Sequence, residues 1–174
     1  MDHDAMLDRL DFVVPGIVMG VTGSALMDVW SAALRRFGIP TLDYRYLGRW
    51  IGHVRNGQLV HERIAASRPV RGELALGWVA HYAIGVTFAF LLLAIWGRPW
   101  LESPTILPAI AVGLGTIVAP WFVMQPAMGA GIAGSKSPNP TAARARNLGT
   151  HAVYGLGLYS AAVAMTVFTG LWPV

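Results

Sequence analysis

Three ionisable side chains lie inside long apolar stretches of this chain, where they can do chemistry that the residues around them cannot. Asp28, His81 and His151 fall within three separate hydrophobic stretches, and the amide of Gln125 falls within a fourth. An ionisable group in bilayer hydrocarbon is costly, so it usually faces a partner or a cavity and serves binding or proton transfer. Histidine titrates near neutral pH and can bind metals, and a carboxylate supplies negative charge. These residues are our candidates for a functional site.

The four polar side chains are expected at a similar depth in the membrane. On helices that rise about 1.5 Å per residue, Asp28, His81 and His151 lie about 8–12 Å from the nearest charged residue on the strongly basic side of the chain. Gln125 lies about five residues from the corresponding end of its own stretch, by the same helical geometry. Four separate segments therefore offer a polar group to one layer of the bilayer.

Small residues repeat at intervals of four around these side chains. Such spacing allows membrane helices to approach one another closely. We therefore predict that the ionisable side chains face neighbouring helices and not lipid. The repeats are Gly16, Gly20, Ser24, Asp28 and Ala32 in the first stretch, Gly77, His81 and Gly85 in the second, and His151 and Gly155 in the last.

The composition indicates lipid as the solvent. Hydrophobic residues make up 55% of the 174 residues and charged residues 13%, whereas a soluble domain carries about 25% charged residues. Four stretches exceed the roughly 20 residues that span a bilayer. We predict an all-α fold, a four-transmembrane-helix bundle forming a single membrane domain over residues 1–174, with Pro108, Pro120 and Pro126 kinking the third helix. The predicted spans are about 12–34, 74–96, 106–130 and 148–171.

The basic residues predict the orientation of these helices. Eleven of the thirteen Lys and Arg residues fall in two connections, about 35–73 and 131–147. Because cytoplasmic loops are enriched in basic residues, we expect both connections in the cytoplasm and both termini on the periplasmic side of a bacterial inner membrane. The net charge of +4 then reflects contact with the lipid bilayer and its anionic headgroups, and we expect no nucleic acid as a partner.

Residues 42–56 are predicted to form a short cytoplasmic amphipathic helix. Arg45, Arg49 and His53 recur every four residues as a polar stripe. Such a helix lies along the inner headgroups, and its arginines are expected to recruit a phosphate or carboxylate to the mouth of the site. The apolar face of the helix consists of Leu42, Tyr46, Leu47, Trp50, Ile51 and Val54.

A cluster of this kind has more than one chemical explanation. Hydrogen bonds between helices would fix the register of the bundle, although such bonds contribute only about 0.6 kcal/mol on average. A site for a polar solute, an ion or a proton would use the charge of Asp28 and the titration of His81 and His151. His81 and His151 could be the axial ligands of a haem, or could join Asp28 around a divalent metal, but the chain has no HExxH motif and no cysteine.

The order of the motifs resembles an uncharacterised family of small bacterial four-span inner-membrane proteins, known only as a domain of unknown function. The resemblance covers nearly the whole chain. It implies a four-span inner-membrane protein and carries no reaction, cofactor or substrate. The matching pieces are 20–30 (GVTGSALMDVW), 48–53 (GRWIGH), 77–82 (GWVAHY), 125–131 (QPAMGAG) and His151.

We therefore predict a non-enzymatic membrane protein that binds or translocates a small polar or anionic solute, coupled to protons. Two alternatives remain: a metal- or haem-binding redox protein, and a structural accessory subunit of a membrane complex. Because four helices seldom enclose a solute path alone, a homo-oligomer or a partner subunit is expected. The predicted site consists of Asp28, His81, Gln125 and His151 within the membrane and Arg45 and Arg49 at its mouth.

Overall fold

The computed structural model describes the backbone of residues 3–168 and the side chains of residues 12–168, and every regular element in this part is helical. The prediction of an all-α fold is therefore confirmed. Residues 169–171, the predicted end of the last span, lie outside the described part. The elements are α1 (His3–Arg36), α2 (Tyr44–Val54), η1 (Ile64–Ala66), α3 (Glu73–Glu102), α4 (Ile106–Gly115), η2 (Pro120–Met124), α5 (Gln125–Ala127), η3 (Ile132–Gly134) and α6 (Pro140–Phe168).

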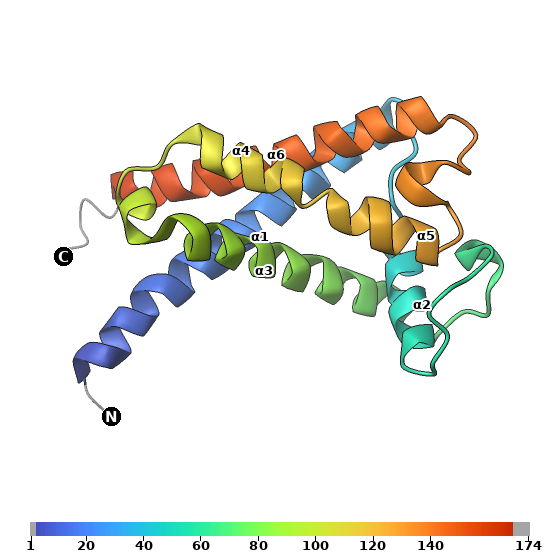
Figure 1. Cartoon of the computed structure of the whole chain (residues 1–174), viewed down its shortest axis with the longest axis horizontal. Coiled ribbons are helices and arrows are strands. Elements are labelled where there is room, and N and C mark those ends of the chain that lie inside the picture. The colour runs from blue at the N-terminus through green and yellow to red at the C-terminus, as the bar shows by residue number, and fades with distance from the viewer. Residues whose placement is uncertain (1–2, 169–174) are drawn as a thin grey trace.

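Four segments of the described chain are long and apolar enough to cross a membrane, so the predicted four-span bundle is also confirmed. They run along the long axis of the molecule (Figure 1). α1 packs against α3 and α6, α4 packs against α6, and α2 packs against α3. The spans are Phe12–Arg36, Glu73–Glu102, Ile106–Ala127 and Pro140–Phe168.

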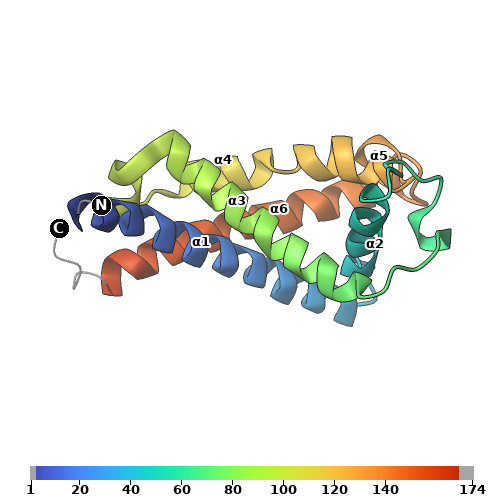
Figure 2. The same ribbon diagram turned by 90° about the horizontal axis from the view of Figure 1, so that it is seen from below.

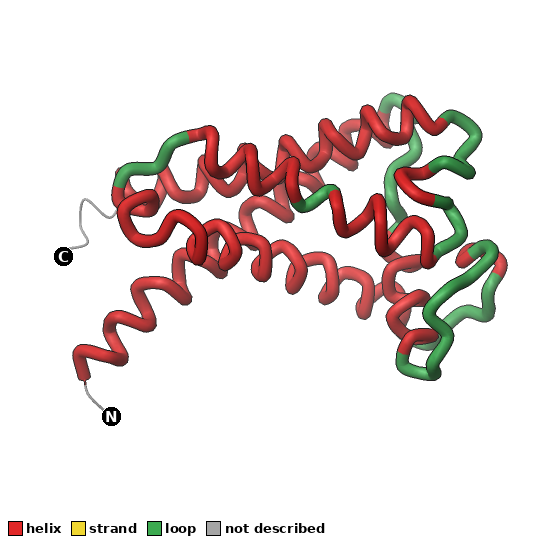
Figure 3. The backbone as a smooth tube through the Cα atoms, in the orientation of Figure 1, coloured by secondary structure: helices red, strands yellow, loops and turns green. Residues whose placement is uncertain are grey.

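The connections separate into two groups at opposite ends of the bundle. The start of α1, the end of α6 and the α3–α4 connection lie together at one end of the bundle, and α2 and α5 lie at the other (Figure 2). Most of the irregular chain gathers at this second end, which we call the α2 end (Figure 3). Both basic connections therefore lie on the same side of the spans, as the charge pattern requires.

Small residues bring the helices into contact, as their spacing predicts. A Cβ atom added at Gly20 of α1 would collide with the backbone of Val86 in α3, and one added at Gly155 of α6 would lie 2.7 Å from the carbonyl oxygen of Ala109 in α4. No side chain fits in either crossing. The small-residue repeats thus set the distance between helices, and the polar residues on the same faces point into the bundle.

The third span is interrupted in its middle. Pro120 has no N–H for the carbonyl four residues earlier, and the chain forms the π-helical turn η2 there. Just before it, Ile117 N donates to Leu114 O at 3.1 Å, and the Thr116 hydroxyl donates to Gly113 O at 2.6 Å. The Thr116 carbonyl, which Pro120 cannot reach, accepts from Ala119 N at 3.1 Å, and the Thr116 hydroxyl satisfies the Gly113 carbonyl that Ile117 N has left. The predicted proline distortion is therefore present.

α6 begins two turns before the predicted fourth span. The Asn139 side chain accepts a hydrogen bond from Ala142 N at 3.0 Å, and Pro140 occupies the first helical position. An asparagine cap followed by proline is a strong helix start. α6 therefore carries Arg144 and Arg146 on helical turns beyond the apolar region.

Replacing Gly155 by Val should destabilise the bundle by about 1–3 kcal/mol or more, because the added side chain overpacks the α4–α6 crossing. The melting temperature of the detergent-purified protein, followed by circular dichroism, measures this effect. Gly115→Val is the matched control, because a Cβ at Gly115 meets nothing within 4 Å. Equal melting temperatures for the two variants would contradict the packing described here.

Candidate ligand-binding site

The helix predicted at residues 42–56 is α2, and it is docked on the bundle through two glycines. A Cβ at Gly48 would collide with the carbonyl of Glu73, and a Cβ at Gly77 of α3 would collide with the carbonyl of Tyr44. The backbones of α2 and α3 therefore touch directly. Asp43 caps α2 by accepting a hydrogen bond from Arg45 N at 2.9 Å. This close docking brings the first residue of α2 to the polar residues of α1 and α3.

Asp28 lies at the centre of a polar cluster that joins three helices. Its Oδ1 accepts from the Tyr44 hydroxyl at 2.7 Å, and its Oδ2 accepts from the Tyr82 hydroxyl at 2.9 Å. His81 Nε2 lies 3.2 Å from Asp28 Oδ1 and 3.1 Å from the Tyr44 hydroxyl oxygen. The His81 ring also stacks on Tyr44, with centroids 4.3 Å apart. We call these four residues the Asp28 cluster.

The hydrogen atoms of the Asp28 cluster can be assigned from its geometry. The single hydroxyl hydrogen of Tyr44 goes to Asp28, so the contact between Tyr44 and His81 requires a hydrogen on His81 Nε2. Burial, followed by the hydrogen bond to Asp28, raises the pKa of Tyr44 far above its usual value, so the hydroxyl remains a donor. The cluster is therefore a carboxylate held by two hydroxyls and an imidazole N–H.

His151 makes a separate polar contact on the opposite wall. Its Nδ1 lies 2.9 Å from Thr116 Oγ1. Because the Thr116 hydroxyl already donates to Gly113 O, this contact requires a hydrogen on Nδ1, and Nε2 of the neutral ring is left as an acceptor. The described residues that meet the ring are Thr116 and the backbone of Gly113.

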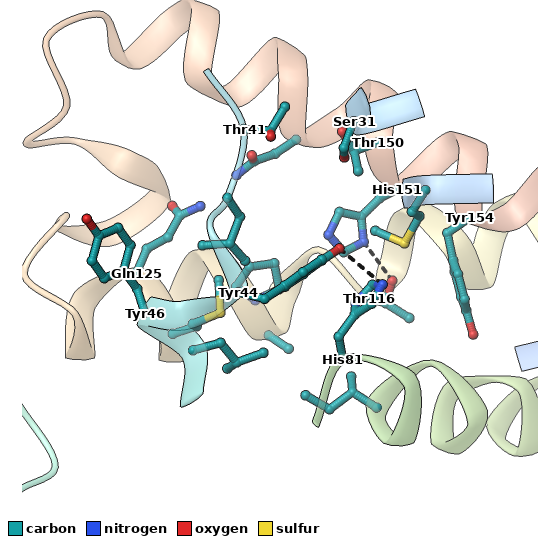
Figure 4. A pocket seen from close by; sticks show the side chains of 18 of the residues that line it. Ser31, Thr41, Tyr44, Tyr46, His81, Thr116, Gln125, Thr150, His151 and Tyr154 are labelled. Atoms are coloured by element: carbon teal, nitrogen blue, oxygen red, sulfur yellow. Dashed lines mark hydrogen bonds between the residues drawn. The ribbon is translucent and has the colours of Figure 1, made fainter. Parts of the chain in front are cut away.

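A cavity of about 700 Å³ lies between these two walls (Figure 4). His81 from α3, Gln125 from α5 and His151 from α6 all line this central cavity, while Asp28 lies behind Tyr44 and His81 and does not. Three of the four predicted intramembrane residues therefore share one cavity, and the fourth is one hydrogen bond away. Most of the remaining lining is apolar; it includes Met27, Leu42, Leu47, Trp50, Ile64, Ile84, Phe88, Val123, Met124 and Met128.

Gln125 is held by a neighbour and presents a free acceptor. With the Asn147 amide in the orientation that satisfies both its ends, Asn147 Oδ1 accepts from Gln125 Nε2 at 2.6 Å and from Trp121 Nε1 at 3.1 Å. Gln125 Oε1 is buried and has no hydrogen-bond partner among the described residues. A buried acceptor without a donor is costly. This oxygen lies toward η3, where a Cβ at Gly134 would be 3.5 Å from it.

Arg49 is a structural residue of the α2 end. Its guanidinium donates to both Glu73 oxygens, at 2.8 and 2.9 Å, and to the carbonyls of Ile64, Ala65 and Ser67. The hydrogen bonds to Glu73 raise the pKa of Arg49. Its side chain is only 7% exposed. Arg49 thus joins α2, α3 and the loop between them, and neither it nor the exposed Arg45 lines the central cavity.

His53 is also buried, so the polar stripe of α2 does not face solvent as a whole. Its Nδ1 lies 2.7 Å from His61 Nε2, and its Nε2 lies 3.0 Å from Arg68 O. His61 is itself buried, and its backbone N–H donates to Ala127 O at 2.8 Å. The loop after α2 folds back over the bundle and covers this face of the helix, which a helical pattern alone does not reveal.

Several site residues escaped the sequence analysis. Tyr44 and Tyr82 hold Asp28, and Thr116 holds His151. One face of α6 also lines the central cavity. These residues recur at the spacing of one helical face, so the sequence could have predicted that they lie together. The tyrosine contacts, in contrast, depend on how the helices cross. The residues of this face are Arg146, Asn147, Thr150, His151 and Tyr154.

The described residues contain no group of three or more His, Cys, Asp or Glu side chains that could hold a metal ion. Asp28 and His81 are in contact, but His151 bonds to Thr116. The three candidate metal ligands therefore do not form one ligand set in this arrangement.

A family model described as "Protein of unknown function (DUF2938)" matches residues 17–165. The chain belongs to this family. The match includes all four intramembrane site residues and every residue of the Asp28 cluster. Neither the curated proteins nor the solved structures contain a match to the chain.

Replacing Arg49 by Gln should cost about 3–5 kcal/mol of stability, because the Glu73 carboxylate would remain buried without its partner. The melting temperature in detergent measures this. Arg45→Gln is the control: its ion pair with Asp43 is long, at 3.8 Å, and both side chains are about half exposed, so a change within about 0.5 kcal/mol is expected. A larger loss for Arg45→Gln would contradict the assignment of Arg49 as the structural arginine.

Replacing Tyr44 by Phe should loosen α2, because a hydrogen bond to a charged group contributes about 1.5–3 kcal/mol. Hydrogen–deuterium exchange of the α2 amides should become faster. Tyr46→Phe should leave exchange unchanged, since no described residue bonds to the Tyr46 hydroxyl. Identical exchange in both variants would show that the Asp28 cluster does not hold α2.

Proposed function

We propose that this protein binds a small polar or anionic solute inside a bacterial inner membrane and exchanges protons with it or alongside it. The α2 end would face the cytoplasm in this proposal, because both basic connections lie there. The observation that carries the proposal is that His81, Gln125 and His151, from three different elements, line a single cavity. Cavities of about 300–1,000 Å³ with a few convergent polar groups are typical of small-molecule sites.

The polar groups around the cavity support binding better than a purely structural role. Residues that only hold helices together satisfy each other. Here Gln125 Oε1 has no partner among the described residues, and His151 Nε2 is left as an acceptor. His151 Nε2 is available to a donor on a ligand, whereas Gln125 Oε1 is enclosed by the protein near Gly134.

The Asp28 cluster supports the coupling to protons. Asp28 and His81 form a carboxylate–imidazole pair within the membrane, and His81 lines the cavity. A proton taken up by this pair would neutralise or create charge beside the bound solute. Translocation would need access from both sides, which a homo-oligomer or a partner subunit would help to enclose.

Filling the cavity tests the proposal. Ala119 lines the cavity, whereas its neighbour Val118 does not and is 55% exposed. After purification into lipid nanodiscs, native mass spectrometry should detect a small molecule retained by the unchanged protein and by Val118→Phe, but not by Ala119→Phe. The reason is steric: a phenyl group at position 119 occupies the space of the ligand.

His151→Gln separates binding from scaffolding. If the site binds a solute, this variant keeps its melting temperature and loses retention of the small molecule. A fall in melting temperature with unchanged retention would favour the accessory-subunit alternative. Identical retained species in Ala119→Phe and the unchanged protein would refute the cavity as a binding site.

A further inference from the structure

α3 and η2 both line the central cavity and do not contact each other, so the edge between them is where the cavity can open. Ile84 of α3 and Val123 of η2, which lie at this edge, are 44% and 56% exposed. Both belong to segments apolar enough to span a membrane. Their exposed surface therefore meets hydrocarbon, and the cavity opens sideways toward lipid.

A second cavity, which we call the α3–α4 groove, adjoins this opening. It has a volume of about 310 Å³ and shares Phe88 and Thr116 with the central cavity. Apart from Thr116, its lining has no polar group but the indole of Trp96. An alkyl chain would be removed from water on such a surface, whereas an inorganic ion would find almost no polar contact there. The other lining residues are Leu91, Ile95, Trp96, Ala111, Val112 and Gly115.

The polar end of the central cavity selects a different chemistry. Among the described residues that line it, Arg146 is the one side chain with a fixed charge, and no described residue pairs with it. A guanidinium at this position favours a phosphate or carboxylate. His151 Nε2 adds an acceptor, which favours a hydroxyl or amine hydrogen on the same head group.

We propose that the ligand of the central cavity is an amphipathic anion that enters from the bilayer between α3 and η2. Its phosphate or carboxylate lies at Arg146, a hydroxyl or amine group faces His151, and its alkyl chain occupies the α3–α4 groove. This inference rests on the proposed function and names its ligand class. A membrane lipid and a free long-chain phosphate or carboxylate share this chemistry.

Three probes separate the parts of the ligand. Purified protein in phosphatidylcholine nanodiscs is titrated with hexadecyl phosphate, with hexadecanol and with inorganic phosphate. Hexadecyl phosphate should bind at least tenfold more tightly than either of the others, because it alone satisfies both regions. Arg146→Gln should weaken this binding about tenfold. Arg144→Gln is the control, since Arg144 is exposed and does not line the cavity.

The lateral opening is tested by a block at its edge. The chain has no cysteine, so Val123→Cys can be labelled with a bulky maleimide at one position. The label should slow uptake of hexadecyl phosphate severalfold. The same label on Leu107→Cys, which is 76% exposed in the same span, should leave uptake unchanged. Equal uptake by the two labelled proteins would overturn lateral entry.

The source of the ligand is decided in nanodiscs that also contain phosphatidylglycerol. Retention of phosphatidylglycerol in native mass spectra, lost in Arg146→Gln, would support a membrane lipid. Binding of hexadecyl phosphate without such retention would support a free amphiphile. Binding of inorganic phosphate as tight as that of hexadecyl phosphate would overturn the ligand class while leaving the proposed solute site intact. If no probe binds and Ala119→Phe retains the same species as the unchanged protein, both proposals fail.

Discussion

The direct backbone contact between α2 and α3 is the constraint on which the rest of the site depends. Gly48 and Gly77 leave no side chain between the two helices, so the first turn of α2 reaches the polar residues of the membrane helices. Tyr44 can then bond to Asp28 and stack on His81. The same docking places Tyr46, Leu47 and Trp50 in the wall of the central cavity. α2 is thus part of the bundle and of the site.

Polar groups within the apolar bundle differ in whether their hydrogen-bonding atoms have partners. At the α2 end, Arg49 and Glu73 satisfy each other and the carbonyls of the adjoining loop, which removes the cost of burying two charges. Around the central cavity, Gln125 and His151 keep an unused acceptor each. The satisfied pair at the α2 end holds structure, whereas His151 keeps an acceptor beside the central cavity. This contrast separates the arginine with a structural role from the residues of the candidate site.

The interruption of the third span links local backbone chemistry to the shape of the cavity. Pro120 breaks regular helical hydrogen bonding, and the chain continues as a π-helical turn. Just before it, Thr116 donates to the carbonyl of Gly113 and also meets His151. The segment after the break lines the central cavity and does not contact α3. The contact that holds His151 therefore lies directly beside the break in the span.

The sequence by itself determined the four spans, the helix at α2 and the inward direction of the polar residues, because these follow from hydrophobic length and from four-residue spacing. The sequence also predicted similar depths in the membrane for Asp28 and His81, and their contact in the structure agrees with this prediction. Only the tertiary structure decided that Tyr44 and Tyr82 hold Asp28, that Arg49 pairs with Glu73, and that His151 faces the other wall. These contacts join residues far apart in the chain, and they depend on how closely the helices cross, which spacing along one helix does not specify.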